Sequence, residues 1–267
     1  MKLAVSNLAW SNDEEPAAAQ KLAALGVKYI ELAPTKQWPD LARVPVDGIT
    51  HRRRFWEDQG FEIVALQAIL FGHPELTLFD NAATRARTLD YLEGTFQLAA
   101  GLGAESLVFG SPKNRRRGDL SPEAALDIAT DFFAEAGCRA HDAGVILVME
   151  PNAPQYGCDF ITTAAEGAEL VHRVNSPGFK LHLDTGCMTM ADDPASEVAK
   201  YPPHHFHISA PNLGPVEPGA ADYQAFAAAL RQTGHDRYVS IEMKPESTGN
   251  LERTTAAVEL SQSIFGD

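Results

Sequence analysis

The 267-residue sequence predicts an α/β fold in which eight parallel strands close into a (β/α)8 barrel. Eight short apolar runs alternate with eight longer stretches of helical periodicity, and this alternation is typical of a parallel sheet. The length is that of one closed barrel, and no linker or change of composition divides the chain. We therefore expect residues 1–267 to form a single domain, with an open doubly wound sheet as the alternative architecture.

The predicted strands are short runs rich in apolar and β-branched residues. Such runs are expected for strands that helices or side chains cover on both faces. In chain order the strands are 3–6, 29–32, 63–67, 106–109, 145–150, 180–184, 205–208 and 238–242.

The predicted helices lie between these strands, where apolar residues recur at spacings of three and four. Ser121 followed by Pro122 is a typical helix start. Glycines directly before strands, such as Gly103, are placed to end the preceding helix. Residues 34–50 are expected to be an irregular excursion after the second strand. The helices are 16–25, 52–59, 83–102, 122–143, 164–174, 194–201, 223–233 and 251–264.

Composition and charge exclude several classes of protein. Hydrophobic residues make up 45% and charged residues 22%, which is ordinary for a folded soluble domain. The apolar runs are too short to span a membrane. A net charge of −14 disfavours binding to the phosphate backbone of nucleic acids. The three cysteines lack the spacing of a disulfide framework, and the first residues lack the pattern of a signal peptide, so we expect a cytoplasmic protein.

Four strands in the second half of the chain end in a group that can bind a metal. In a (β/α)8 barrel the active site lies at the carboxyl ends of the strands. These ends are Glu150, Asp184, His207 and Glu242. One polar residue at a strand end is common, but three carboxylates and an imidazole at one level predict a site for a single divalent cation. Mn²⁺ fits this set best, with Mg²⁺, Co²⁺ or Zn²⁺ as alternatives.

The chain resembles the xylose isomerase-like TIM barrels of AP endonuclease family 2, in the branch of sugar and sugar-phosphate isomerases and epimerases. The resemblance implies that Glu150, Asp184, His207 and Glu242 bind one metal. It also implies that Glu150 and Glu242 act on the substrate carbon from opposite faces. The motifs that carry it are Glu150-Pro151-Asn152, Asp184-Thr185-Gly186, Phe206-His207 and Ser240-Ile241-Glu242.

The implied activity is the isomerisation or epimerisation of a small sugar or sugar phosphate through an enediolate. One carboxylate removes the proton next to a carbonyl, and for epimerisation a second carboxylate returns a proton to the other face. A dehydratase of a keto-cyclitol or related acid in the same superfamily stays open, because it begins with the same proton abstraction.

Several residues near the strand ends are candidates for contact with the substrate. Residues 113–117 form a basic loop after the fourth strand, in which we expect Asn114 or Arg115 to face inward and Arg116 and Arg117 to face outward. Many relatives carry histidine where this chain has Cys187, and an arginine in the segment after His207. Neither is present here, which leaves the substrate open. The candidates are Asn7, Glu31, Gln67, Asn114, Arg115 and Cys187.

Other functions fit the sequence less well. An endonuclease for abasic DNA would need more histidines for three zinc ions and a less acidic chain. A sugar-binding barrel without catalysis would have no need of four metal ligands. Neither a phosphate-binding P-loop nor a dinucleotide-binding glycine motif is present. The expected partner is a carbohydrate, and small residues at 225–229 allow assembly into a homo-oligomer.

Overall fold

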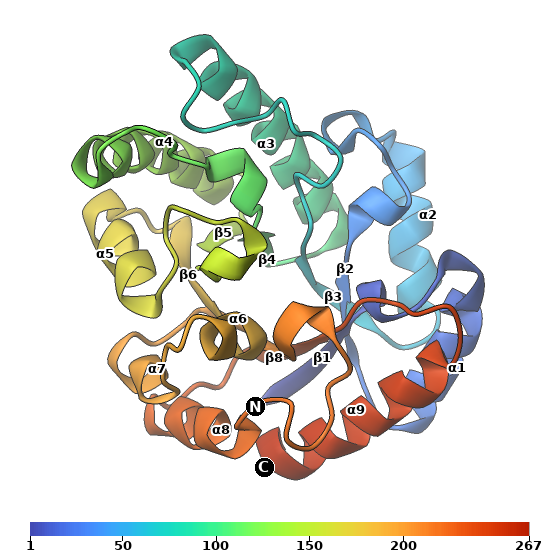
Figure 1. Ribbon diagram of the computed structural model, residues 1–267. Coiled ribbons are helices and arrows are strands. Elements are labelled where there is room, and N and C mark those ends of the chain that lie inside the picture. Colours follow the sequence, from blue (N-terminus) through green and yellow to red (C-terminus); the bar gives the residue numbers. More distant parts are fainter. Residues whose placement is uncertain (267) are drawn as a thin grey trace.

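The computed structural model describes residues 1–266, and its strands close into a barrel in the order β1 to β8 (Figure 1). All neighbouring strands are parallel, which confirms the predicted barrel and excludes the open sheet. The strands are β1 (Lys2–Ser6), β2 (Tyr29–Leu32), β3 (Glu62–Leu66), β4 (Ser106–Phe109), β5 (Ile146–Met149), β6 (Phe179–Asp184), β7 (His205–Ser209) and β8 (Tyr238–Glu242).

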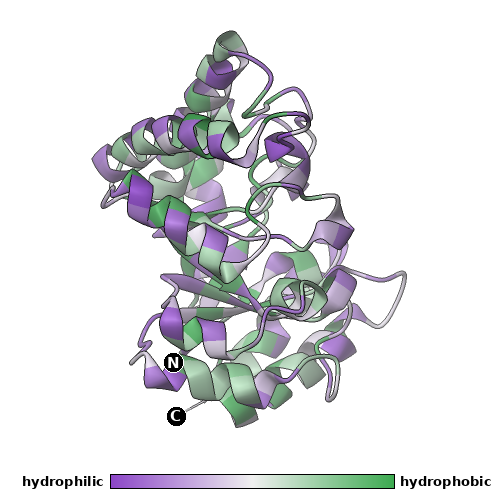
Figure 2. Cartoon of the chain, turned by 60° about the vertical axis from the view of Figure 1, so that its left-hand side comes forward, coloured by the Kyte–Doolittle hydropathy of each residue, from purple (hydrophilic) through white to green (hydrophobic). Residues whose placement is uncertain are grey.

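The helices surround the barrel and alternate with its strands (Figure 1). Hydrophobic and hydrophilic residues alternate along them, as expected where one helix face packs on the strands and the other meets water (Figure 2). They are α1 (Glu15–Ala24), α2 (Val46–Glu57), α3 (Ala82–Leu102), α4 (Pro122–Asp142), α5 (Ala164–Val174), α6 (Thr185–Met190), α7 (Ser196–Lys200), α8 (Tyr223–Gln232) and α9 (Asn250–Phe265).

Two helical segments differ from the prediction. Helix α2 begins at Val46, so the expected irregular excursion ends at Pro45. Helix α6 was not predicted at all, because it begins directly at the end of β6 without a loop. The side chain of Asp184 accepts a hydrogen bond from the backbone N–H of Cys187 and so caps α6. Helix termination at Gly103 is as predicted, with a φ of 86° in the left-handed region.

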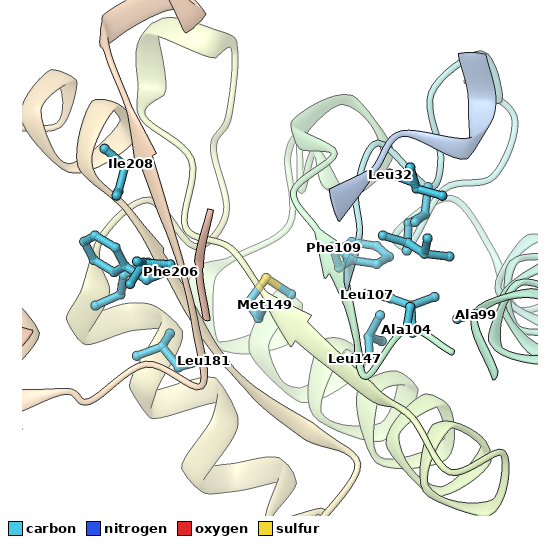
Figure 3. Close-up of a cluster of buried hydrophobic side chains, with 14 of the residues drawn as sticks. Leu32, Ala99, Ala104, Leu107, Phe109, Leu147, Met149, Leu181, Phe206 and Ile208 are labelled. Carbon is cyan, nitrogen blue, oxygen red and sulfur yellow. The ribbon is translucent and has the colours of Figure 1, made fainter. Parts of the chain in front are cut away.

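Apolar side chains fill the space between the strands and the helices (Figure 3). Phe109 at the end of β4 and Met149 at the end of β5 are buried in this core. The residues that follow them, Gly110 and Glu150, emerge at the carboxyl end of the barrel. The core therefore fixes the height at which Glu150 stands. None of the helices within residues 1–266 combines the length and apolar composition needed to cross a membrane.

Candidate metal centre

The four predicted ligands lie together at the carboxyl end of the barrel. One ligand atom from each of Glu150, Asp184, His207 and Glu242 lies within 4.8 Å of the others. The strand register accounts for this, because Asp184 pairs with His207 across β6 and β7, and Glu242 lies opposite Ser209 across β7 and β8. Four side chains from separate strands thus meet at one level.

The donor set fits a cation. Nδ1 of His207 lies 3.2 Å from Oε2 of Glu242, 3.8 Å from Oε1 of Glu150 and 3.9 Å from Oδ2 of Asp184. Within residues 1–266, both His207 Nδ1 and Asp184 Oδ2 are buried without a hydrogen-bond partner. Leaving such an atom unsatisfied costs about 1–3 kcal/mol. Both unpaired atoms belong to the same cluster, so one divalent cation would satisfy both.

Asp184 is held so that one of its oxygens stays free. Its Oδ1 accepts hydrogen bonds from Ser209 Oγ at 2.8 Å and from the Cys187 backbone N–H at 2.5 Å. Oδ2 has neither partner and belongs to the cluster. The sequence did not predict this role of Ser209, because its contact with Asp184 depends on the pairing of β6 with β7.

The three carboxylates of the cluster are only partly compensated, by His207, when no metal is bound. Burial and the neighbouring carboxylates of Glu150 and Glu242 raise the pKa of Asp184 to about 7. Burial also raises the pKa of Glu242, against the lowering effect of His207. A protonated carboxyl at neutral pH is the response expected when like charges are buried together.

Metal affinity is therefore expected to fall as the pH decreases through about 7, because protons compete for Asp184. If one proton is displaced, the loss approaches about tenfold for each pH unit below that point. Chelator competition from about pH 8 to about pH 6 measures this dependence. An affinity that does not change with pH would contradict the coupling.

The stability of the metal-free protein should respond with the opposite sign. The folded state holds a proton on Asp184 that the unfolded state releases at its ordinary pKa, so stability decreases as the pH rises toward about 7. Asp184→Asn lacks this carboxyl, so its stability should depend less on pH over this range, and chemical denaturation of the two proteins measures the difference.

His207 is oriented by a buried carboxylate behind it. Its Nε2 lies 3.1 Å from both oxygens of Glu31, and Nε2 of His205 lies 3.2 Å from Oε2 of Glu31. Burial would lower the pKa of His207, but Glu31 and Glu242 raise it well above its usual value. Burial would raise the pKa of Glu31, but His207 and His205 hold it well below its usual value. With a proton on Nε2, His207 would present Nδ1 to a metal ion in the cluster.

The expected contact of Glu31 with substrate is therefore not supported. Glu31 has no exposed surface, and its oxygens face the two imidazoles. Sequence reasoning also missed His182 and His205, which lie buried behind the cluster. The alternation of side chains along a strand could have identified them. His182 stands two residues before Asp184, and His205 stands two residues before His207, so each points to the same side of its strand as the proposed ligand.

Glu31→Gln is expected to weaken metal binding about 10–100-fold, the usual effect of losing a carboxylate that orients a histidine ligand. Glu62→Gln, at the opposite end of the barrel, is the matched control. Isothermal titration with Mn²⁺ makes the comparison. Equal affinities in the two variants would show that Glu31 does not orient His207.

Arg115 is a structural residue and not the predicted substrate contact. Its guanidinium is fully buried and donates to the backbone oxygens of Phe109, Phe160 and Glu150, the last at 2.8 Å. It also donates to Asn152 Oδ1 at 2.8 Å, and Asn152 Nδ2 donates to Glu150 Oε2 at 2.9 Å. Arg115 thus fixes Asn152, which in turn holds the carboxylate of Glu150.

Asn7 and Asn114 connect loops. Nδ2 of Asn114 donates to the backbone oxygens of His73 and Leu76 at 2.7 and 2.8 Å. Oδ1 of Asn7 accepts a bond from Ala33 N at 2.7 Å. These bonds position the walls of the site, and the structure brings neither side chain into the metal cluster.

The remaining candidates lie in different surroundings. Gln67 donates to Ser6 Oγ inside the barrel. Arg116 is exposed as expected, whereas Arg117 is half-buried and donates to the backbone oxygens of Asp159 and Leu120. Arg117 therefore departs from the expected outward orientation.

Cys187 is the candidate substrate contact that lies beside the cluster. Its thiol is buried, and Sγ accepts a weak bond from Asn152 Nδ2 at 3.5 Å. Burial and the nearby carboxylates of Asp184 and Glu150 raise the pKa of this thiol well above its usual value. Cys187 is therefore a neutral, polarisable group close to Glu150 and Asp184.

Comparison with known proteins agrees with this architecture. A crystal structure of D-psicose 3-epimerase with D-fructose superposes with a TM-score of 0.81 at 19% identity, over 100% of both chains. A structure of L-ribulose 3-epimerase gives 0.81 at 19% identity, over 98% of this chain and 94% of the other. The IOLI protein, solved with a bound zinc atom, gives 0.78 at 19% identity, over 99% and 98%. At these identities the likeness shows the fold.

A search of curated protein sequences gives no match to this chain. The family described as xylose isomerase-like TIM barrels, AP endonuclease family 2, matches residues 19–264. That match covers most of the sequence and agrees with the closed barrel. The chain therefore belongs to the family of xylose isomerase-like TIM barrels.

Proposed function

We propose that this chain epimerises or isomerises a small sugar or sugar phosphate with the help of one divalent metal ion. The observation that carries the proposal is the convergence of Glu150, Asp184, His207 and Glu242 within 4.8 Å at the strand ends. The names of two structural neighbours, a psicose and a ribulose 3-epimerase, support the substrate class.

The metal would be held by one oxygen each of Glu150, Asp184 and Glu242 and by Nδ1 of His207. When bound, a divalent cation stabilises the negative charge that develops on a carbonyl oxygen of the substrate. We propose Mn²⁺, because a set of three carboxylates and one imidazole is harder than the thiolate-containing sets that select zinc.

Glu150 and Glu242 are the proposed catalytic pair. Glu150 directly follows β5 and Glu242 is the last residue of β8, so their carboxylates reach the cluster from different strands of the barrel. One removes the proton from the carbon next to the carbonyl, and the other returns a proton to the opposite face. In an isomerase a single carboxylate would return the proton to the neighbouring carbon on the same face.

Cys187 remains the proposed substrate contact from this chain's own residues. It shares Asn152 with Glu150, so a substrate hydroxyl at the thiol would lie close to the proposed base. A neutral thiol at this position offers a weak hydrogen bond and no charge. That property suits an uncharged hydroxyl of the substrate.

The test is solvent-deuterium exchange by the Mn²⁺-loaded protein with a panel of ketoses and ketose phosphates. The proposal predicts that deuterium enters next to the carbonyl and that the product is an isomer of the substrate. Loss of water would identify the dehydratase of the same superfamily. A metal-loaded protein that exchanges no proton across the panel would contradict the proposal.

A further inference from the structure

A cavity lies at the carboxyl end of the barrel, which is also the end that carries the metal cluster. It occupies about 250 Å³ between the loops that follow β1 and β2 and the helices α1 and α2. Strand β1, whose following loop lines the cavity, is the neighbour of β8, the strand that carries Glu242. The polar lining of the cavity consists of Asn7, Asn12, Glu15, Lys36, Gln37 and Arg52, with the indole of Trp38.

The cavity wall carries more positive than negative charge. Two cations, Lys36 and Arg52, share one carboxylate, that of Glu15. Arg52 takes both oxygens of Glu15 in a buried two-pronged ion pair, with Nη2 at 2.7 Å from Oε1. The ammonium of Lys36 bonds instead to the backbone oxygens of Asn7 and Trp10, the latter at 2.6 Å. The lining of the cavity thus holds two cations and one carboxylate, and Glu14, outside the lining, also attracts Lys36.

Both cations have N–H groups beyond those used in the hydrogen bonds described above. An ammonium has three N–H groups, and Lys36 uses two of them on backbone oxygens. A guanidinium has five, and Arg52 uses two on Glu15. Burial lowers the pKa of Lys36 to about 8, which reflects the cost of holding this charge away from water. An anion in the cavity would offset that cost.

We propose that this cavity binds an oxyanion, a carboxylate or phosphate group, through Lys36 and Arg52. A lysine that only tied the two loops together would need neither a cavity beside it nor a second cation facing the same space. The group belongs either to the substrate of the neighbouring centre, in which case the inference rests on the proposed function, or to a separate small anion.

The test is titration of the Mn²⁺-loaded protein with inorganic phosphate, measured by isothermal calorimetry. Lys36→Met is expected to weaken binding about tenfold or more, the effect of losing a charged donor. Lys28→Met makes the same change of charge at the opposite end of β2 and should leave binding unchanged. Phosphate that does not bind, or that binds equally to both variants, would overturn the proposal, since binding at the metal alone would survive Lys36→Met.

A second pair of variants keeps the test decisive if Lys36→Met does not fold. Asn12 lines the cavity and is exposed, so Asn12→Glu adds a negative charge at its mouth without disturbing the core. We expect phosphate to bind about threefold more weakly to Asn12→Glu than to Asn12→Gln, because the interaction between two exposed charges is small. Equal binding by these two variants would count against the cavity.

Kinetics then distinguish the two sources of the anion. If the group belongs to the substrate, phosphate competes with substrate, and Lys36→Met raises KM more than it lowers kcat. If a separate anion binds, phosphate changes the rate without competing. Both results support the cavity as an oxyanion site. Calorimetry measures phosphate binding without turnover. The binding result therefore stands even if the protein does not catalyse the proposed reaction.

Discussion

Glu150→Gln and Glu242→Gln are each expected to reduce proton exchange about 10²–10⁴-fold, the usual contribution of a positioned acid or base. Glutamine keeps an oxygen that can face a cation but cannot take up a proton. For an epimerase, either substitution should stop net inversion, because each face of the substrate needs its own carboxylate. The measurement is deuterium exchange on metal-loaded variants with matched metal content.

Glu259→Gln is the matched control, because Glu259 is exposed on α9, away from the strand ends. Its exchange rate should equal that of the unsubstituted protein. If Glu150→Gln and Glu242→Gln exchange as fast as this control, neither carboxylate is the base.

Gly110→Ala is expected to weaken metal binding by displacing the side chain of Glu150, although Gly110 is not itself a proposed ligand. A Cβ at position 110 would stand 1.9 Å from Oε2 of Glu150, a distance that no real contact allows. Either the carboxylate of Glu150 turns and loses its bond from Asn152, or the strand end shifts, and each outcome changes the position of Glu150 in the cluster. We expect metal affinity to fall about tenfold or more, as after loss of a group that orients a ligand.

Gly48→Ala is the control for this substitution. A Cβ at position 48 meets nothing closer than 3.8 Å, and alanine suits the interior of α2. Calorimetry with Mn²⁺ and thermal unfolding of both variants separate loss of the site from loss of the fold. If the close approach to Glu150 is the cause, Gly110→Ala should cost little more in a Glu150→Gln background, a non-additive result. Unchanged metal affinity in Gly110→Ala would contradict this account of the position.

The convergence of the four proposed metal ligands could be predicted from the sequence, because the carboxyl ends of all strands of a closed barrel lie on one side. Once alternation of strands and helices indicated a closed barrel, the residues after the apolar runs of β5 to β8 had to meet at one rim. Glu150, Asp184, His207 and Glu242 do meet there. Their identification needed only local patterns and the order of the strands.

The residues around the ligands could not be predicted in the same way. Glu31 and His207 are 176 positions apart, and nothing local shows that their side chains face each other inside the barrel. Arg115 faces inward, as one of the two residues of the basic loop expected to do so, but nothing local shows that its guanidinium bonds to backbone oxygens of other segments. Local sequence patterns do not show these contacts, because each joins residues that are far apart in the chain and meet only in the folded barrel.

The start of α2 and the whole of α6 were missed for local reasons. Pro45 and Gly48 made the segment before residue 52 resemble a loop, although proline before a helix and glycine within it are both tolerated. Helix α6 is six residues long and has too few turns for an apolar period to show. Only its cap, Asp184, was visible in the sequence, and that residue was assigned to the metal alone.

We propose above all that Glu150, Asp184, His207 and Glu242 hold one divalent cation. The most direct measurement is the metal content, by elemental analysis, of protein stripped with a chelator, reloaded with Mn²⁺ and desalted, compared with Asp184→Asn and Glu259→Gln. The account predicts one metal ion per chain in the unsubstituted protein and in Glu259→Gln, and a large loss in Asp184→Asn. No metal in the unsubstituted protein, or equal metal in all three, would contradict it.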